Sequence, residues 1–334
     1  MREPDPPERP VGRFAPSPTG GLHLGSALVA LGAWLSVRSR GGRFVWRVED
    51  LDGPRAVPGA EAAQIADARW LGLDWDEGPE IGGPHAPYRQ SERGAHYEAA
   101  LGTLAEAGRL FPCRRSRKDL QALATAPHGR GGLPPYPVTL RPKHLPPDWF
   151  DTYRTTERPD AALRFRVSER GVAFDDRVQG RIIENVAAEV GDFVLKRRDG
   201  VYAYQLAVVV DDLLMGVTEV VRGADLLDSA ARQLQLIDAL GGTPPAYAHL
   251  PLVVNAQGKK LSKRDGVADL SGLRDRGVAP EALVGWLAHA TGLLDAPRAV
   301  TPAALVAAFS WERIRSEPIT VPDDLPGTLA ISTP

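Results

Sequence analysis

The chain of 334 residues is longer than one hydrophobic core usually organises, so two or three domains are expected. Charged residues make up 25% and hydrophobic residues 43%, a balance typical of a soluble globular protein and not of a disordered or membrane-spanning one. The first seven residues contain no apolar segment, so we expect no signal peptide, and the single cysteine, Cys113, excludes an intrachain disulfide and a thiolate-rich metal cage. These features predict a cytoplasmic protein. The net charge of −2 neither favours nor excludes a nucleic-acid partner.

The first third of the chain alternates between strand and helix patterns after a Pro- and charge-rich segment, residues 1–10, which is expected to be a disordered tail. The expected elements are a strand at 13–15, a turn at 16–21, a helix whose Leu24, Leu28, Leu31 and Leu35 share one face, a strand at 43–48, and helices at 58–71 and 91–108. Residues 43–48 alternate, with Phe44, Trp46 and Val48 expected on one side of the strand. Pro58 and Ser91 are expected at the starts of the last two helices, and Gly72 at the end of the first of them. Strand and helix alternating at this spacing predict a parallel sheet with crossover helices.

A Pro/Gly-rich stretch in the middle of the chain predicts an inserted α+β subdomain, residues 111–185, between two halves of the α/β core, residues 11–110 and 186–264. The second half is expected to contain a strand at 217–222, a helix at 229–240 capped by Asp228, and a strand at 249–254. A helical region, 265–315, and a Pro-rich tail, 316–334, follow. The predicted fold class is α/β, with a Rossmann-like parallel sheet.

Two segments of the core carry chemistry. The turn at 16–21 consists of small residues that let backbone N–H groups approach a ligand, and the next helix presents its positive end, so together they predict a phosphate site. His23 and Ser26 are three residues apart in the first helical turn and are expected to face the same way. A merely solvated histidine is the common alternative at a helix start.

The second segment is a lysine loop. Three of the six lysines in the chain, Lys259, Lys260 and Lys263, follow a strand that is expected to belong to the same sheet. Ammonium groups on a flexible loop neutralise a polyphosphate leaving group as its charge grows. A solvated basic loop is the alternative.

Considered together, these segments are far more specific. PSPTG at 16–20 with LHLG at 22–25, and KLSKR at 260–264, resemble the HIGH and KMSKS signatures of class I aminoacyl-tRNA synthetases. RFAPSPTG at 13–20, RVEDLD at 47–52, VVVDD at 208–212 and VRGAD at 221–225 are similar to the glutamyl branch of that class. Only about 70 residues follow Lys263, too few for the anticodon-binding domain of a glutamyl-tRNA synthetase. With Ser26 where HIGH has its second histidine, and GDFVL at 191–195, the chain resembles the truncated relatives of that enzyme, the glutamyl-Q tRNA(Asp) synthetases.

The resemblance implies activation of L-glutamate with ATP, independent of tRNA, and transfer of glutamate to the queuosine base at the wobble position of tRNA(Asp), by a chain that we expect to be monomeric. It also implies that 265–315 is a stem-contact region and that 111–185 is of the acceptor-binding type. The glutamate-binding residues that it implies are Arg13, Phe14, Ala15, Pro16, Ser17, Glu49, Tyr204 and Arg222. The implied ATP-binding residues are Ser17, Gly21, His23, Gly25, Ser26, Lys260 and Lys263, of which His23, Lys260 and Lys263 are catalytic.

Metal binding is expected only through ATP, which enters with Mg²⁺ because polyphosphate charge requires a divalent ion. Relatives often carry zinc in the insertion through a Cys-x-Cys pair, a tyrosine and a third cysteine. Here Arg115 stands where the second cysteine would be, and Leu140 follows Tyr136 in place of the third. We therefore predict no structural zinc and no protein metal site, with hydrophobic packing or salt bridges stabilising the insertion instead.

Three other functions remain open from the sequence. The chain could be a minimal glutamyl-tRNA synthetase that charges a terminal adenosine, a small-molecule nucleotidyltransferase with a similar helix start, or an inactive glutamate- or tRNA-binding regulator. The Arg13, Glu49 and Arg222 set with the late KLSKR disfavours the nucleotidyltransferase, and the intact His23, Lys260 and Lys263 disfavour the regulator.

Overall fold

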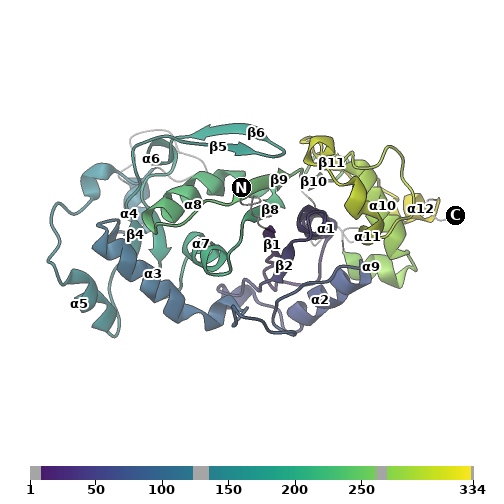
Figure 1. Ribbon diagram of the computed structural model, residues 1–334. Helices are drawn as coiled ribbons and strands as arrows, with labels where there is room; N and C mark the ends of the chain where they lie inside the picture. Colours follow the sequence, from purple (N-terminus) through teal and green to yellow (C-terminus); the bar gives the residue numbers. More distant parts are fainter. Residues whose placement is uncertain (1–8, 123–134, 260, 262–268, 332–334) are drawn as a thin grey trace, which may run out of the picture.

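A mixed sheet forms the centre of the computed structural model, which describes residues 9–122, 135–259, 261 and 269–331 (Figure 1). Within these residues the sheet has six strands in the order β2-β1-β8-β9-β5-β6, and every neighbouring pair is parallel except β5 and β6. The strands are β1 (Val11–Phe14), β2 (Arg43–Trp46), β5 (Val172–Asp176), β6 (Gly180–Glu184), β8 (Glu219–Gly223) and β9 (Ala246–Leu250). The predicted Rossmann-like parallel sheet is thus confirmed. Most of the expected N-terminal tail, residues 1–8, lies outside the described residues.

The order of the strands creates a switch point between β1 and β8. From β1 the chain moves outward to β2, and the strand on the other side of β1 is β8, which comes about 200 residues later. Ligands of open parallel sheets bind beyond the carboxyl ends of the strands at such a point. Arg13 and Arg222 lie near those ends of β1 and β8.

Helices cover both faces of the sheet (Figure 1). Phe44 and Trp46 of β2 join the core on the side of α1 (Leu24–Arg38), whereas Val45 joins a cluster on the opposite side, as the predicted alternation requires. More of the surface of helix α1 is buried than the expected stripe of four leucines, because the helix lies between the sheet and the C-terminal helices. On the other face lie α7 (Tyr204–Leu214) and α8 (Leu227–Ala239), and the helices α2 (Ala60–Trp70) and α3 (Gly94–Glu106) connect the first half to the insertion.

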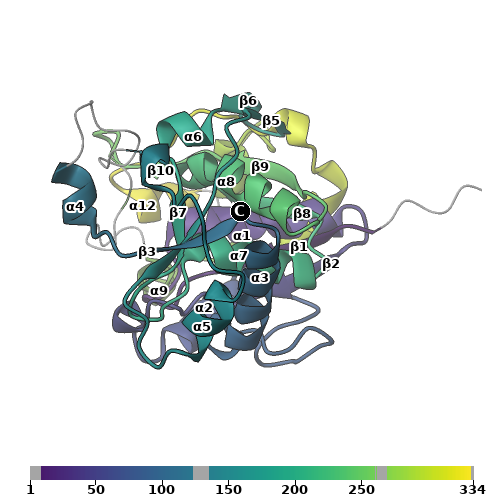
Figure 2. The ribbon, with the colours of Figure 1, turned by 90° about the vertical axis from the view of Figure 1, so that its left-hand side faces the viewer.

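The insertion has its own antiparallel sheet at one end of the molecule, at the left in Figure 1 and toward the viewer in Figure 2. Its elements are β3 (Leu110–Cys113), β4 (Ala162–Phe165), β7 (Phe193–Lys196), α4 (Arg117–Ala122), α5 (Trp149–Thr155) and α6 (Val186–Glu189). Strand pairing divides the chain differently from the expected boundaries 111–185. The hairpin of β5 and β6 lies inside that range but extends the main sheet, whereas β7 lies beyond it and completes the insertion sheet. Pro and Gly content marks the loops, and it carries no information about which strands pair.

The described part of the C-terminal region contains short helices up to residue 313, as expected, and differs from the prediction after residue 315. Its elements are α9 (Leu270–Asp275), α10 (Pro280–Ala290), α11 (Pro302–Leu305), β11 (Ile319–Thr320) and α12 (Leu325–Ile331). The expected tail, 316–334, is wrong for its described part, because Leu325 and Leu329 are buried in the main core and β11 pairs with β10 (Val253–Val254). The expected strand at 249–254 is broken at Pro251, so the lysine loop follows β10 in this two-stranded sheet and not a strand of the main sheet.

Three helices begin at residues other than those expected. Helix α2 begins after Gly59, which adopts φ 79°, and not at Pro58. Ser91 does not cap α3, because its amide and hydroxyl donate to the carboxylate of Asp50 at 2.8 and 2.6 Å. Asp228 lies inside α8 and pairs with Arg232 at 3.4 Å. None of the helices in the described part of the chain has the length and apolar character that crossing a membrane requires.

Candidate active site

A cavity of about 400 Å³ opens at the switch point of the main sheet. Twelve of the sequence-predicted site residues line it: Arg13, Phe14, Ala15, Pro16, Ser17, Gly21, His23, Gly25, Ser26, Glu49, Tyr204 and Arg222. They come from β1 and the turn after it, the first turn of α1, the segment after β2, the start of α7, and β8. Lys260 and Lys263 lie outside the described residues, but Leu261 between them lines the cavity. The fold therefore brings together in one cavity all the predicted site residues that it describes.

Side chains of α2 fix the shape of the turn after β1 through hydrogen bonds to its backbone. The side-chain amide of Gln64 donates to the carbonyl oxygens of Ser17 and Gly20 at 2.9 and 2.8 Å, so a turn without regular secondary structure has a fixed shape. The carboxylate of Asp67, one helical turn later, accepts the amide hydrogen of Leu22 at 2.9 Å. Backbone groups of this turn are thus positioned before any ligand arrives.

The first turn of α1 faces the cavity, and His23, Gly25 and Ser26 line it. His23 is the N-cap, and its Nδ1 accepts the amide hydrogen of Ser26 at 3.1 Å. Because Nδ1 is an acceptor, the proton of the neutral ring lies on Nε2, where the Ser26 hydroxyl is 3.1 Å away. The expectation that His23 and Ser26 face the same way is confirmed. A side chain at Gly25 would bring its Cβ within 3.1 Å of the His23 ring, which explains a glycine inside a helix.

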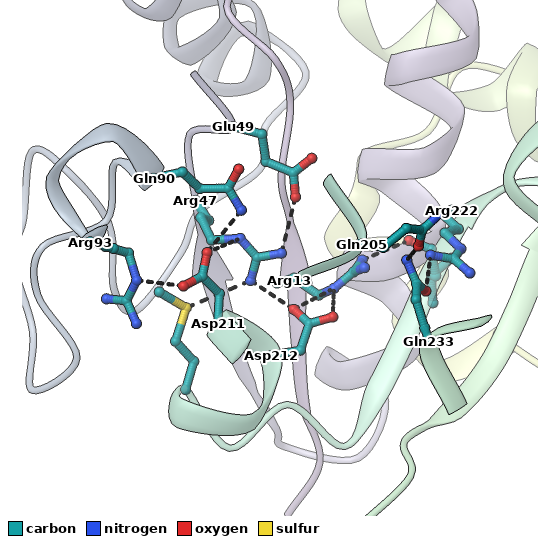
Figure 3. Close-up of polar contacts among 12 residues, drawn as sticks. Arg13, Arg47, Glu49, Gln90, Arg93, Gln205, Asp211, Asp212, Arg222 and Gln233 are labelled. Atoms are coloured by element: carbon teal, nitrogen blue, oxygen red, sulfur yellow. Dashed lines mark hydrogen bonds and ion pairs between the residues drawn. The ribbon is translucent and has the colours of Figure 1, made fainter. Parts of the chain in front are cut away.

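A buried network of charges surrounds Arg13 (Figure 3). The Nε of Arg13 donates to both carboxylate oxygens of Asp212, at 3.3 and 3.4 Å, and its Nη1 donates to the carbonyl of Val221 at 3.2 Å. Arg47 lies between three carboxylates: its Nη1 is 2.7 Å from Asp212, its Nη2 is 3.1 Å from Glu49, and its Nε is 3.7 Å from Asp211. Arg13 is thus paired with Asp212 and Glu49 with Arg47, and the two residues are not paired with each other.

The pKa directions follow from this network. Burial raises the pKa of Glu49, and the guanidinium groups of Arg47 and Arg13 oppose that rise. Burial also disfavours ionised Asp212, but Arg13 and Arg47 outweigh it, and the pKa of Asp212 lies below its usual range. Burial raises the pKa of the Tyr204 hydroxyl, which stays protonated. The cavity thus presents two fixed cations and a carboxylate that gains from a further cation.

Arg222 occupies the other side of the cavity. Its Nη1 donates to the side-chain carbonyl of Gln233 at 2.7 Å, and Gln233 in turn donates to Gln205 at 2.9 Å (Figure 3). Its Nε donates to Nε2 of His249 at 2.9 Å. Within the described residues its Nη2 is buried without a hydrogen-bond partner. A buried guanidinium nitrogen of this kind is suited to a carboxylate that enters with the ligand.

The insertion shows what occupies the zinc-ligand positions of the family. Cys113, Tyr136 and Leu140 do lie together, but the Tyr136 hydroxyl is 3.6 Å from the Cys113 sulfur and donates to the carbonyl of Leu140 at 3.2 Å. Phe111 and Leu120 complete an apolar cluster around them. Beside it, Arg141 holds both carboxylate oxygens of Asp192 at 2.7 Å. Among the described residues, no three His, Cys, Asp or Glu side chains are grouped as metal ligands would be.

The parallel sheet and the cavity at its switch point are those of a class I aminoacyl-tRNA synthetase. Residues 11–295 match the family model for tRNA synthetases class I (E and Q), catalytic domain, and the chain belongs to this family of ligases. The resemblance found in the motifs is confirmed, since the curated relatives at 41–49% identity carry the name glutamyl-Q tRNA(Asp) synthetase.

Two of these relatives, and one solved structure, show how completely the chain matches. The protein from Symbiobacterium thermophilum is 49% identical over 96% of this chain and 99% of its own length. The one from Nitratidesulfovibrio vulgaris is 45% identical over 94% and 96%, respectively. The crystal structure of a glutamate tRNA ligase from Elizabethkingia meningosepticum, in complex with its amino acid, superposes with a TM-score of 0.84 at 30% identity, over 96% of this chain and 69% of that one.

The residues that sequence reasoning missed are those behind the cavity wall. Asp212 lies in a segment that resembles the family, but nothing indicated that it pairs with Arg13, 199 residues away. Arg47 follows β2 and could have been suspected as a charge in an otherwise apolar strand pattern. His249 gave no signal, because a single histidine in an apolar strand has the same pattern as any core residue.

Proposed function

We propose that this chain activates L-glutamate with ATP to glutamyl-adenylate without tRNA, and then transfers the glutamate to the queuosine base at the wobble position of tRNA(Asp). The observation that carries the proposal is the placement of Arg13, Glu49 and Arg222 around one cavity in a chain that matches relatives of that name over nearly their whole length. We propose that it acts as a cytoplasmic monomer.

Glutamate suits the charges of the cavity. A free amino acid with an acidic side chain carries two carboxylates and one ammonium group, and the cavity offers two guanidinium groups and one carboxylate. Arg222, with Nη2 available, would bind the side-chain carboxylate, and Glu49 would accept from the ammonium group. The Tyr204 hydroxyl, protonated because burial raises its pKa, can donate to a carboxylate oxygen. Phe14, Ala15 and Pro16 close the wall beside them.

The reaction requires positioning more than covalent participation by the protein. The α-carboxylate of glutamate attacks the α-phosphorus of ATP in line, a new O–P bond forms, and the bond to the β-phosphate oxygen breaks to release pyrophosphate. The amide groups at the start of α1, with His23 and Ser26 beside them, would hold the phosphate oxygens. Lys260 and Lys263 would follow the pyrophosphate as it leaves, and the Mg²⁺ of the ATP complex would neutralise charge on the phosphates.

The first test is glutamate-dependent ATP–pyrophosphate exchange without tRNA, with aspartate and glutamine as control substrates. Exchange with glutamate alone, followed by transfer of labelled glutamate to queuosine-containing tRNA(Asp) and not to the same tRNA lacking queuosine, is the expected result. Transfer to a periodate-sensitive terminal adenosine of tRNA(Glu), with exchange only after tRNA is added, would instead identify a minimal glutamyl-tRNA synthetase. No exchange under either condition would refute the proposed activation of glutamate.

A further inference from the structure

A line of three buried side chains leads from the end of β5 to the cavity. Asp176 at the end of β5 is 2.5 Å from Nδ1 of His249 on β9, and Nε2 of His249 accepts from Nε of Arg222 at 2.9 Å. The three residues are exposed by 4%, 0% and 4%, so water does not screen or replace these contacts. Only Arg222 of the three lines the cavity.

The hydrogen bonds of this line require one form of the imidazole ring. Nε2 can accept from Arg222 only if it carries no proton, so the proton of the neutral ring must lie on Nδ1. The carboxylate of Asp176 accepts a hydrogen bond from this Nδ1–H and thereby fixes the tautomer, much as carboxylates fix the histidines that bind metals. Asp176 is itself held by the backbone amides of Val178, Gln179 and His249 at 3.0, 2.9 and 3.1 Å.

Electrostatics agree with this form of the ring. Burial lowers the pKa of His249, and the guanidinium of Arg222 lowers it further, against the hydrogen bond to Asp176. Burial disfavours ionised Asp176, but its hydrogen bonds to His249 and Gln179 prevail and lower its pKa to about 2. A neutral imidazole therefore lies between a carboxylate and a guanidinium, and a protonated ring would place a second cation against Arg222.

We infer that His249 is a positioning residue for Arg222: with Asp176 it orients the guanidinium so that only its Nη nitrogens face the cavity. Of the five N–H donors of an arginine, one on Nε is bound to His249 and one on Nη1 to Gln233. The three that remain lie on Nη1 and Nη2, so a carboxylate is bound end-on. The inference rests on the proposed function. It adds that the orientation of Arg222 by His249 makes the site favour a side-chain carboxylate over an uncharged amide.

The test compares variants at position 249 in ATP–pyrophosphate exchange with the full-length protein. For His249→Leu, which cannot accept from Arg222, we expect the KM for glutamate to rise by roughly 10- to 100-fold, with the KM for ATP unchanged, because a charged hydrogen bond to the substrate loses its geometry. The preference for glutamate over glutamine, as a ratio of kcat/KM, should fall by a similar factor. In His249→Gln an amide oxygen can take the place of Nε2, and most of the loss should be restored.

His85 provides a matched control, because its Nδ1 is 2.7 Å from the buried carboxylate of Glu77 and it does not line the cavity. His85→Leu should leave the KM for glutamate unchanged. Two results for His249→Leu would overturn the positioning role: equal rises in the KM for ATP and for glutamate, or a preference for glutamate over glutamine equal to that of the unmodified chain. Failure of His249→Gln to restore the KM for glutamate would overturn it as well. If the unmodified chain shows no exchange with glutamate, the proposed function itself fails, and the inference fails with it.

Discussion

Replacing Arg47 with methionine tests whether the buried charges behind the cavity act as one balanced unit. Arg47 is fully buried and contacts Glu49, Asp211 and Asp212. Methionine has a similar length and no charge, so Arg47→Met removes the cation without opening a large cavity.

The magnitude follows from the charge balance. Three guanidinium groups and three carboxylates contact one another in this network: Arg13, Arg47, Arg93, Glu49, Asp211 and Asp212. Removing one cation leaves a net negative charge in the interior, and breaking a buried ion pair in this way typically costs about 3–5 kcal/mol of unfolding free energy. Replacing both Arg47 and Asp212, as Arg47→Met with Asp212→Asn, restores the balance and should cost less than the single change.

The assay is denaturant unfolding of the unmodified chain and of Arg47→Met, each at pH 7.5 and pH 5.5. Burial already raises the pKa of Glu49, and loss of Arg47 removes an opposing contact, so this pKa rises further in the variant. The folded variant then binds a proton more readily than its unfolded chain, and its stability recovers as the pH falls. The loss at pH 5.5 should therefore be smaller than at pH 7.5.

Arg38→Met is the matched control, since Arg38 pairs with the exposed carboxylates of Asp74 and Asp76 at 3.0 and 2.8 Å. Surface pairs of this kind contribute about 0–1 kcal/mol. A loss for Arg47→Met no larger than for Arg38→Met, or one that is the same at both pH values, would refute the reasoning.

Three further predictions concern the cavity and the C-terminal region. Gly25→Ala places a methyl group against the His23 ring and should slow ATP–pyrophosphate exchange by about tenfold. The melting temperature should not fall, since alanine favours helix over glycine by about 0.5–1 kcal/mol. An unchanged exchange rate would contradict the close approach of residue 25 to the His23 ring. The KM for glutamate should rise as the pH falls through the raised pKa of Glu49, because a proton there competes with the substrate ammonium, and in Glu49→Gln the KM should be high and independent of pH over that range. Leu325→Ala should lower the unfolding free energy by about 2–5 kcal/mol, whereas a side chain in a solvated tail would show no loss in the same denaturation experiment.

The sequence predicted those features that depend on local pattern. The alternation of Phe44, Val45 and Trp46 identified β2 and its two faces, and the turn followed by a leucine-rich helix placed a ligand site at the start of α1. Local pattern failed where a contact with a distant segment decides the outcome. Ile319 and Leu325 lie in a segment with the composition of a tail. Ile319 nevertheless pairs with β10, and both side chains are buried in the main core.

The expected boundaries of the insertion differ from the strand pairing for the same reason. Composition identified a loop-rich stretch, but β5 and β6 within it return to the main sheet, and Asp176 at the end of β5 reaches His249. A part of the chain that was expected to belong to the insertion thus supports one wall of the cavity. No signal in a single sequence indicates a pairing across 73 residues.

The partners of Arg13 and Arg222 explain why the cavity can be both highly charged and ready for a ligand. Each guanidinium has its Nε bound to the protein, Arg13 to Asp212 and Arg222 to His249, so neither can rotate toward solvent when the cavity is empty. The partners differ in charge: the carboxylate of Asp212 neutralises Arg13, whereas the neutral imidazole of His249 orients Arg222 and leaves its charge uncompensated in that contact. Arg222 is therefore the stronger site for an incoming anion, and because its orientation is fixed in advance, little reorganisation is required when the carboxylate binds. This difference predicts that substitutions that neutralise Arg222 affect glutamate binding more strongly than those that neutralise Arg13.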